Sequence, residues 1–466
     1  MNFTDTMQTG LSTISPLDLF FPALFIGALL AVGFVRSGKR NDTEEFLLMG
    51  RSLSAPAFIM SLVTSWYGGI LGVSEYSYSY GLSNWFVFGL PYYLHAVIFA
   101  LFLAKRARRS RLYSIPDKLR QAYGDSPARL GALVIFLTTM PAAYLLMLGK
   151  LTSWMFGWSY PVALLAGVLF STLYIYTGGL RSIVRTDMLQ FIVMYGGFAV
   201  MVVVLITKFG GLDYLREHVK PELFTPTGGQ GFAAIFVWYI IAATTLIEPV
   251  FYERVYASKS EKQVLPGILI SIGFWAIFDF MTTATGLYAR AVIGDISDPA
   301  FAFPELAARV LPAGLFGLFL AALLATIMST IDSYSFIAAG ALGRDLLGKP
   351  EQHAQSPRRI RLALIATTAC AFLLAMASNS IVSLWHGLGS VAAPVLLIPM
   401  LSALSEKHSF ARALVLPAML TSGTIALLWR LSTFWTASGA YWLNVEPIYI
   451  GIGVSCGFYL LGRVTK

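Results

Sequence analysis

Residues 51–75 read Arg51-Ser-Leu-Ser-Ala-Pro-Ala-Phe-Ile-Met-Ser-Leu-Val-Thr-Ser-Trp-Tyr-Gly68-Gly69-Ile-Leu-Gly72-Val-Ser-Glu75. The stretch is long and apolar enough to cross a membrane, yet two adjacent glycines lie near its middle and favour an unwound turn there. The alternative is an unbroken helix whose small residues pack closely against a neighbouring helix. Either interpretation places the stretch inside a helical membrane bundle.

The composition of the whole chain also indicates a membrane protein. Of its 466 residues, 57% are hydrophobic and 12% are charged, against about 45–50% and about 25% in a typical soluble domain. Residues 76–104, 151–180 and 362–405 contain no charged residue. A membrane helix needs about 20 apolar residues, whereas a barrel would show short alternating segments. We therefore predict an all-α, polytopic membrane protein.

Hydropathy predicts about thirteen transmembrane helices. Their approximate bounds are 17–36, 52–80, 84–104, 126–156, 158–179, 182–208, 231–256, 264–289, 311–345, 358–378, 380–404, 411–430 and 444–462. The division of 358–404 into two spans rests on the break at residues 378–380. Because no connection is long enough to fold as a soluble domain, residues 1–466 are predicted to form one transmembrane domain.

The basic residues predict the orientation of the chain. The first span has no Lys or Arg before it and is followed by Arg36, Lys39 and Arg40. The positive-inside rule then places the N-terminus outside, and an odd number of spans places the C-terminus in the cytoplasm. A secretory signal would instead carry basic residues before its apolar run. We expect a multi-pass protein integral to the cell (inner or plasma) membrane.

The sequence lacks the signatures of catalytic and nucleotide-binding proteins. Its two cysteines, Cys370 and Cys456, lie far apart in apolar runs, which argues against a disulfide framework or a cysteine metal site. No Walker A motif, dinucleotide-binding glycine pattern or His/Glu zinc spacing occurs. In a membrane protein, the distribution of basic residues matters more than the net charge of +9. We expect no enzyme activity, no nucleic-acid binding and no obligate protein partner.

A second span contains residues that interrupt a helix. Thr244, Thr245, Glu248 and Pro249 lie within residues 231–256, five spans after the glycine-containing one. Transporters built from inverted repeats place their solute and ion sites where two such discontinuous helices meet. The alternative is a proline kink without a functional role.

The ninth predicted span carries a stripe of hydroxyl groups. Thr326, Ser329, Thr330 and Ser333 follow the spacing i, i+3, i+4, i+7, which places them on one helix face, with Asp332 at its edge. Hydroxyls at this spacing, beside carbonyls of an unwound helix, provide the oxygen ligands that Na⁺ requires. The alternative is hydrogen bonding of the hydroxyls within or between helices.

Five stretches of the chain together resemble the sodium/solute symporter family. They are Glu45–Leu53, Tyr113–Asp117, Gly178–Gln190, Tyr252–Lys259 and Ala325–Ser333. Glu253 stands where the family usually has Gln. The resemblance covers residues 44–345 and extends more loosely to residue 404.

The resemblance implies a LeuT-type fold with ten core helices in two inverted five-helix repeats. In this chain the core would comprise residues 52–404. The helix at 17–36 would precede it, and two peripheral helices within 411–462 would follow it.

The resemblance also implies a sodium site. The hydroxyls of Ser329 and Thr330 would bind Na⁺ together with the carbonyl of Thr326 and two carbonyls of the interrupted second span. Gly72 comes about two residues earlier than in the family, so the alignment leaves two possibilities for those carbonyls. The alternative pairs are Leu62 with Ser65 and Thr64 with Tyr67.

Some relatives have a second sodium site, and Asp187, Asp332 and Ser333 match its positions. The number of coupled Na⁺ ions is therefore one or two. The alternative for Asp187 is a structural role, because an acidic side chain stabilises the first turn of a helix.

The resemblance implies a secondary active transporter that couples inward Na⁺ movement to uptake of a small organic solute by alternating access. Candidate solute-binding residues, which could instead serve bundle packing, come from the interrupted spans and the helices facing them. They are Trp66, Tyr67, Glu75, Tyr92, Thr244, Glu248, Trp385 and His386. Glu75 and Glu248 favour a solute with an amine or another positive group.

The sequence is also compatible with two other functions. A proton-coupled transporter of the same fold would use Asp187, Asp332 or Glu75 as the proton carrier. A sensor would bind the solute without transporting it.

The charge pattern predicts that residues 105–120 and 346–360 face the cytoplasm and that residues 1–15 and 432–443 face outward. A cysteine placed at Ser110 should therefore resist a membrane-impermeant thiol reagent added to intact cells and react after permeabilisation. Labelling of Ser110→Cys in intact cells would contradict the predicted orientation.

Overall fold

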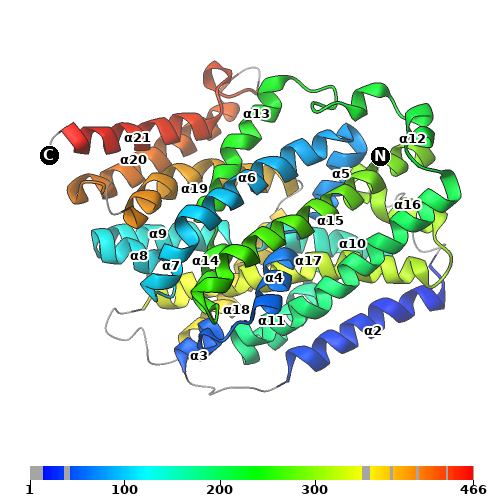
Figure 1. Cartoon of the computed structure of the whole chain (residues 1–466), viewed down its shortest axis with the longest axis horizontal. Coiled ribbons are helices and arrows are strands. Elements are labelled where there is room, and N and C mark those ends of the chain that lie inside the picture. The colour runs from blue at the N-terminus through cyan, green and yellow to red at the C-terminus, as the bar shows by residue number, and fades with distance from the viewer. Residues whose placement is uncertain are drawn as a thin grey trace.

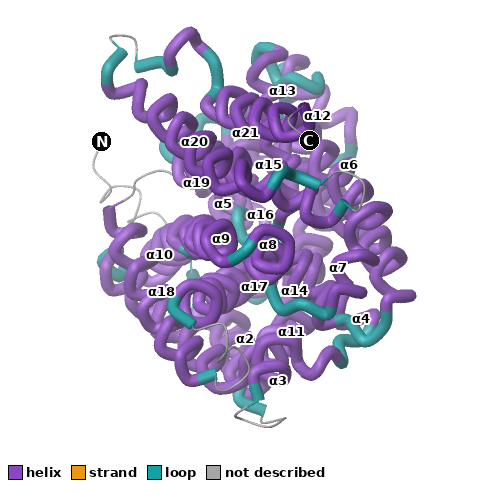
Figure 2. Tube along the Cα trace, turned by 90° about the vertical axis from the view of Figure 1, so that its left-hand side faces the viewer, coloured by secondary structure: helices purple, strands orange, loops and turns teal. Residues whose placement is uncertain are grey.

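The computed structural model describes residues 14–35, 42–348, 357–377, 381–405, 409–436 and 439–464, without the side chains of 381–386 and 388. The described residues form helices and short connections, and their one β-type contact is an isolated bridge between Leu53 and Ser258. Figures 1 and 2 show this all-helical architecture, with several helices seen nearly end-on in Figure 2. The architecture agrees with the sequence, because a helix satisfies its own backbone hydrogen bonds in lipid. The all-α prediction is confirmed.

The helices of the first half of the chain contain both predicted spans and short surface segments. They are α2 (Pro16–Gly33), α3 (Thr43–Leu48), η1 (Met49–Arg51), α4 (Ala55–Thr64), α5 (Ile70–Tyr80), η2 (Trp85–Gly89), α6 (Leu90–Ile98), η3 (Phe99–Leu103), α7 (Ala104–Ser110), α8 (Ile115–Tyr123), α9 (Asp125–Thr138), α10 (Ala142–Phe156), α11 (Tyr160–Phe209), α12 (Leu212–His218) and η4 (Pro221–Phe224).

The second half continues in the same way. Its helices are α13 (Phe232–Ile241), η5 (Ala242–Ile247), α14 (Pro249–Ala257), η6 (Glu261–Gln263), α15 (Val264–Ile293), η7 (Pro299–Phe301), α16 (Ala302–Val310), α17 (Leu315–Gly340), η8 (Ala341–Leu346), α18 (Arg358–Ala377), α19 (Ile381–Leu404), α20 (Arg412–Leu431), η10 (Ser432–Phe434), η11 (Trp442–Asn444) and α21 (Pro447–Val464).

Ten helical stretches in the described part of the chain are long and apolar enough to cross a membrane. The count of thirteen stays a prediction, partly because one helix covers two predicted spans. Helix α11 has 50 residues, which at 1.5 Å per residue would be about 75 Å long, more than twice the hydrocarbon core of about 30 Å. Its backbone leaves helical geometry at Gly179 (φ 60°, ψ −152°), where a side chain would strike the Phe46 carbonyl. Two helical segments therefore meet at Gly179.

Both expected helix interruptions are present. Helix α4 ends at Thr64, residues 65–69 form turns, and α5 begins at Ile70. In the second case, η5 follows α13, Glu248 is extended, and α14 begins at Pro249. Proline suits the first position of a helix because its missing N–H has no helical partner there.

Helix α17 occupies the interior of the bundle and packs against α2, α10, α11 and α18. The most apolar part of Leu315–Leu346 has 89% of its residues buried, whereas the other long helices leave a face exposed. Its sequence explains this position, because apolar, small and hydroxyl residues surround the whole helix and leave no charged face for solvent.

The connections fall into two groups at opposite ends of the bundle. Ion pairs Arg181–Glu45, Arg344–Asp117 and Arg109–Glu261 join one group. Lys150–Asp298 and Arg290–Asp295 join connections of the other group. In Figure 1, α7 and α8 lie toward the left, whereas α12 and α16 lie at the right. This grouping is the one that alternating spans require, and the absolute orientation stays a prediction.

Candidate functional site

A cavity of about 230 Å³ lies where the two interrupted helices meet. Trp66, Tyr67 and Gly69 bound it at the first interruption, and Glu248 and Pro249 bound it at the second. We call it the central cavity. A smaller cavity of about 50 Å³ shares the lining residues Ile135 and Pro249 with it and extends toward the bundle end that contains α7 and α8.

The structure places five of the eight predicted solute residues on the wall of the central cavity. These are Trp66, Tyr67, Tyr92, Thr244 and Glu248. Glu75 is exposed on α5 and does not line the cavity. The side chains of Trp385 and His386 lie outside the described residues.

The sequence analysis missed Asp279, a lining residue on α15. This side chain is buried, and its carboxylate accepts a hydrogen bond from the hydroxyl of Tyr93. An ionisable residue in the middle of an apolar span is a functional candidate in itself. That signal was present in the sequence, although Asp279 belongs to no motif.

The hydroxyl stripe of α17 contacts the end of α4. The Ser329 hydroxyl donates to the Thr64 carbonyl at 2.9 Å and to the Thr326 carbonyl at 3.0 Å, and the Thr330 hydroxyl donates to the Ser65 carbonyl at 3.1 Å. The alignment left two pairs of carbonyls possible, Leu62 with Ser65 or Thr64 with Tyr67. The structure brings one residue of each pair, Ser65 and Thr64, to the hydroxyls of α17. Five oxygen atoms from two helices thus converge in the interior of the bundle, where Ser329 and Thr330 are fully buried.

The close contact between α17 and the α4–α5 turn requires a glycine. A Cβ atom at Gly68 would lie 2.3 Å from Cβ and 2.4 Å from Oγ1 of Thr330. The absence of a side chain at Gly68 therefore lets Thr330 reach the turn. This close approach gives a local reason for one of the two adjacent glycines.

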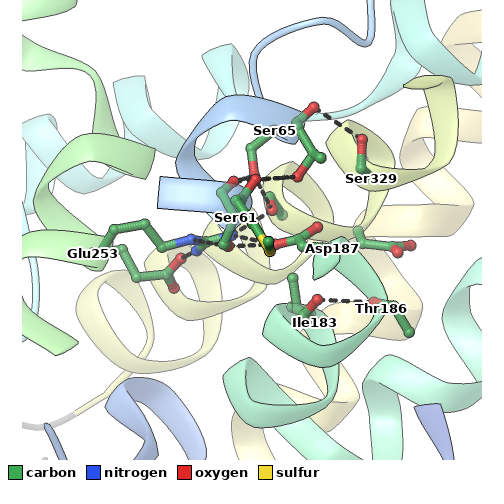
Figure 3. A network of polar contacts seen from close by, with 12 residues as sticks. Ser61, Ser65, Ile183, Thr186, Asp187, Glu253 and Ser329 are labelled. Carbon is green, nitrogen blue, oxygen red and sulfur yellow. Dashed lines mark hydrogen bonds and ion pairs between the residues drawn. The ribbon is translucent and has the colours of Figure 1, made fainter. Parts of the chain in front are cut away.

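Two of the three predicted ligands of a second sodium, Asp187 and Ser333, contact a guanidinium group. Arg254, on α14, donates to Ser61 at 2.8 Å and to Ser333 at 2.6 Å, and forms an ion pair of 3.4 Å with Asp187. It also hydrogen-bonds Ser65 at 3.3 Å and pairs with Glu253. Figure 3 shows Glu253 and Asp187 approaching this network from opposite sides, with Ser61 between them.

Asp332, the remaining member of the predicted second site, faces another partner. Its carboxylate accepts a hydrogen bond from the hydroxyl of Tyr174 on α11. Its other oxygen is buried and has no hydrogen-bond partner among the described residues. The structure thus gathers Asp187 and Ser333 around Arg254 but leaves Asp332 outside that set of contacts.

The contact between α17 and the end of α4 consists of neutral oxygen atoms. Within the described ranges, no group of three or more His, Cys, Asp or Glu side chains is arranged to hold a metal ion. The oxygens that converge at Ser329 and Thr330 are neutral carbonyls and hydroxyls. Freed helix carbonyls of this kind coordinate Na⁺ in transporters with discontinuous helices.

Comparison with known proteins identifies related sequences. The family model "Sodium:solute symporter family" matches residues 46–410. The osmoregulated proline transporter OpuE of Bacillus subtilis is 24% identical over 95% of this chain and 94% of its own length. The sodium/pantothenate symporter of Escherichia coli is 28% identical, and the match covers 79% of each chain.

Solved structures share the fold. A Na⁺-coupled sialic acid symporter in a substrate-bound, outward-open state superposes with a TM-score of 0.79 at 15% identity, covering 97% of both chains. Mhp1, a nucleobase-cation-symport-1 family transporter, superposes with a TM-score of 0.61 at 13% identity, covering 92% of this chain and 95% of the other. These superpositions confirm the predicted LeuT-type fold.

The contact at Gly68 makes a steric prediction. Gly68→Ala should lower thermal stability by about 1–3 kcal/mol, because overpacking forces neighbouring groups apart. It should also weaken the stabilisation of the protein by Na⁺, because Thr330 moves away from the turn. Both effects are measured on purified protein by thermal unfolding with and without Na⁺.

Gly196→Ala is the matched control, because a Cβ atom there would meet no heavy atom within 4 Å. If Gly68→Ala had the stability and sodium dependence of the unchanged protein, the close approach of α17 to the turn would be wrong.

Proposed function

The chain belongs to the sodium:solute symporter family, and we propose that it uses one Na⁺ to drive inward movement of a small organic solute across the plasma membrane by alternating access. Membership makes it a multi-pass membrane transporter coupled to Na⁺ rather than an enzyme. The observation that carries the ion assignment is the contact of Ser329 and Thr330 with freed carbonyls of the interrupted helix.

We assign the sodium site to oxygens of α17 and the end of α4 that hydrogen-bond in pairs, Ser329 with Thr64 and Thr326, and Thr330 with Ser65. They are the hydroxyls of Ser329 and Thr330 and the carbonyls of Thr64, Ser65 and Thr326. When Na⁺ binds, the two hydroxyls turn their lone pairs to the ion instead of donating hydrogen to the carbonyls. The ion then replaces hydrogen bonds that already connect α17 with α4.

The sodium gradient supplies sufficient energy for concentrative uptake. One Na⁺ crossing about 100 mV contributes about 2.3 kcal/mol, and a tenfold concentration gradient contributes about 1.4 kcal/mol. The sum of about 3.7 kcal/mol permits accumulation of several hundredfold for an uncharged solute.

A single coupled ion is favoured by the position of Arg254. Its guanidinium hydrogen-bonds Ser333 and pairs with Asp187, two of the three residues expected to bind a second sodium. A buried carboxylate needs a compensating positive charge. Because Arg254 supplies that charge, Asp187 needs no second Na⁺.

The solute route is assigned to the two cavities. The central cavity binds the solute between the interrupted helices, and the smaller cavity, which Glu253 and Arg344 help to line, leads toward the cytoplasmic end. The core of residues 52–404 performs this exchange. The helix at 17–36 is an additional N-terminal helix, the pair within 411–462 is peripheral, and the N-terminus faces outward.

The sodium site predicts a graded mutational response. Ser329→Ala and Thr330→Val should each weaken sodium affinity by about tenfold to a hundredfold, because each loses an oxygen ligand worth about 1.5–3 kcal/mol, by analogy with a charge-assisted hydrogen bond. Thr330→Ser keeps the hydroxyl and should be mild. Solute affinity should fall by linkage and recover mostly at saturating sodium, because coupling between binding sites is reciprocal.

These constants are measured in reconstituted proteoliposomes with an imposed sodium gradient at constant pH, which separates Na⁺ coupling from proton coupling. If Ser329→Ala and Thr330→Val both keep the sodium dependence of the unchanged protein, the hydroxyl stripe serves helix packing only and the sodium assignment is wrong.

The ion number predicts the shape of the sodium activation curve. With Arg254 as the resident cation, sodium-dependent uptake should have a Hill coefficient near one, and direct flux measurement should give one Na⁺ per cycle. Arg254→Lys retains a cation at this position and serves as the conservative comparison for Arg254→Gln. A measured stoichiometry of two Na⁺ in the unchanged protein would refute the assignment.

A further inference from the structure

Two carboxylates face the central cavity without a basic partner. Glu248 and Asp279 both line it, and no Lys, Arg or His occurs among its described lining residues. Among the ion pairs of the described residues, none includes Glu248 or Asp279. Burial of an unpaired carboxylate in a membrane-embedded bundle is costly.

Each carboxylate is oriented by hydroxyl groups. The Tyr334 hydroxyl donates to Glu248 Oε1 at 3.1 Å, and the Tyr93 hydroxyl donates to Asp279. Glu248 also occupies the cap position before Pro249, where the partial positive charge of the α14 N-terminus favours an anion. These contacts fix the two side chains, but hydroxyls and a helix end provide no full positive charge.

Several other buried acids in the described part of the chain have a cationic partner. Asp187 and Glu253 pair with Arg254, and Asp117 pairs with Arg344. The buried residues Asp18 and Asp332 also lack a basic partner in the ion pairs of the described part, but neither lines the central cavity. Glu248 and Asp279 therefore differ from Asp18 and Asp332 in lining the central cavity, where a positively charged solute can reach them.

The remaining walls of the cavity are rich in aromatic rings. The aromatic lining residues are Trp66, Tyr67, Phe88, Tyr92, Tyr144, Trp238 and Tyr334. Ring faces attract ammonium groups, most strongly where water is excluded. The volume of about 230 Å³ lies below the range of about 300–1,000 Å³ for drug-sized ligands, so the solute is small.

We propose that the transported solute carries a positively charged nitrogen, which Glu248 and Asp279 bind between aromatic walls. The inference rests on the proposed transport function and names the solute class of the same site. The sequence analysis paired Glu248 with Glu75. The structure replaces Glu75 by Asp279, because Glu75 is exposed whereas Asp279 lines the central cavity. The positive nitrogen belongs either to a simple organic cation or to a zwitterion, and the experiment separates these two sources.

The test begins with thermal-shift measurements on the purified full-length protein in saturating Na⁺. The cationic probes are propylammonium, tetramethylammonium, choline and 1,4-diaminobutane, and the zwitterionic probes are proline and glycine betaine. Butyrate and pantothenate are the anions, and 3,3-dimethylbutan-1-ol is the neutral isostere of choline. We expect stabilisation by at least one positively charged probe and no stabilisation by the anions or the isostere, because only a bound ligand raises the melting temperature by mass action.

The variants then test the residues. Asp279→Asn and Glu248→Gln should each weaken binding of the stabilising probe by at least about tenfold, because a buried ion pair loses one partner. Glu305→Gln, which removes an acid of α16 outside the cavity, is the matched control and should bind normally. A preference for cations over zwitterions would identify a simple ammonium ion as the solute class, and the reverse preference would identify a zwitterion.

Stabilisation by anions or neutral compounds alone, or no stabilisation by any positively charged probe, would overturn the proposal. So would unchanged affinity in both variants. If the proposed Na⁺ coupling is wrong, solute uptake will not depend on sodium, but the order of probe affinities will stay the same. The two proposals therefore fail in different measurements. Ser329→Ala should likewise change the sodium requirement without changing that order.

Discussion

The fold depends on the carbonyl groups that become free where α4 ends inside the bundle. In a low-dielectric interior, each of these groups needs a hydrogen-bond donor or a cation. Ser329 and Thr330 provide the donors, at 2.9 Å from the Thr64 carbonyl and 3.1 Å from the Ser65 carbonyl. This requirement places a helix without charged faces, α17, at the centre, and it explains the glycine at position 68 where the two segments touch. The same oxygens form the sodium site that we propose.

A second constraint connects one segment of each interrupted helix, α4 and α14. The N–H of Leu53 donates to the Ala257 carbonyl, and the N–H of Lys259 donates to the Leu53 carbonyl, so the start of α4 is fastened to the end of α14. Arg254 then connects this unit to Asp187 on α11 and Ser333 on α17. Separating Arg254 from Asp187 without a replacement partner would cost about 3–5 kcal/mol. Arg254 therefore holds α4, α11, α14 and α17 together at this end of the bundle.

The sequence predicted features that depend on local chemistry and missed those that depend on the packing of distant helices. Adjacent glycines in mid-span and a proline beside polar residues favour a break in a helix, and hydroxyls at helical spacing share a face in any helix, so the two breaks and the α17 stripe were predictable. The choice of Thr64 and Ser65 carbonyls required the register of α4 against α17. Asp279 lies in an unbroken apolar span and reaches the cavity only through the position of α15. Glu75 is five residues into α5, about 7.5 Å along the helix, and this distance places it beyond the cavity despite its closeness in sequence to the break.

The arrangement of the first interruption also explains how ion and solute sites influence each other. The carbonyls of Thr64 and Ser65 face the hydroxyls of α17, whereas the next two residues, Trp66 and Tyr67, line the central cavity. Tyr67 further donates a hydrogen bond to the Trp275 carbonyl at 2.8 Å, which connects the turn to α15 near Asp279. A change in backbone geometry at Thr64 and Ser65 cannot leave the adjacent peptide units unaffected, because consecutive residues share rigid planar peptide groups. We therefore expect Na⁺ at the proposed site to alter the wall of the central cavity, because the Ser65 carbonyl belongs to the peptide group that joins Ser65 to Trp66, and solute binding would then alter the ion site by an equal coupling free energy.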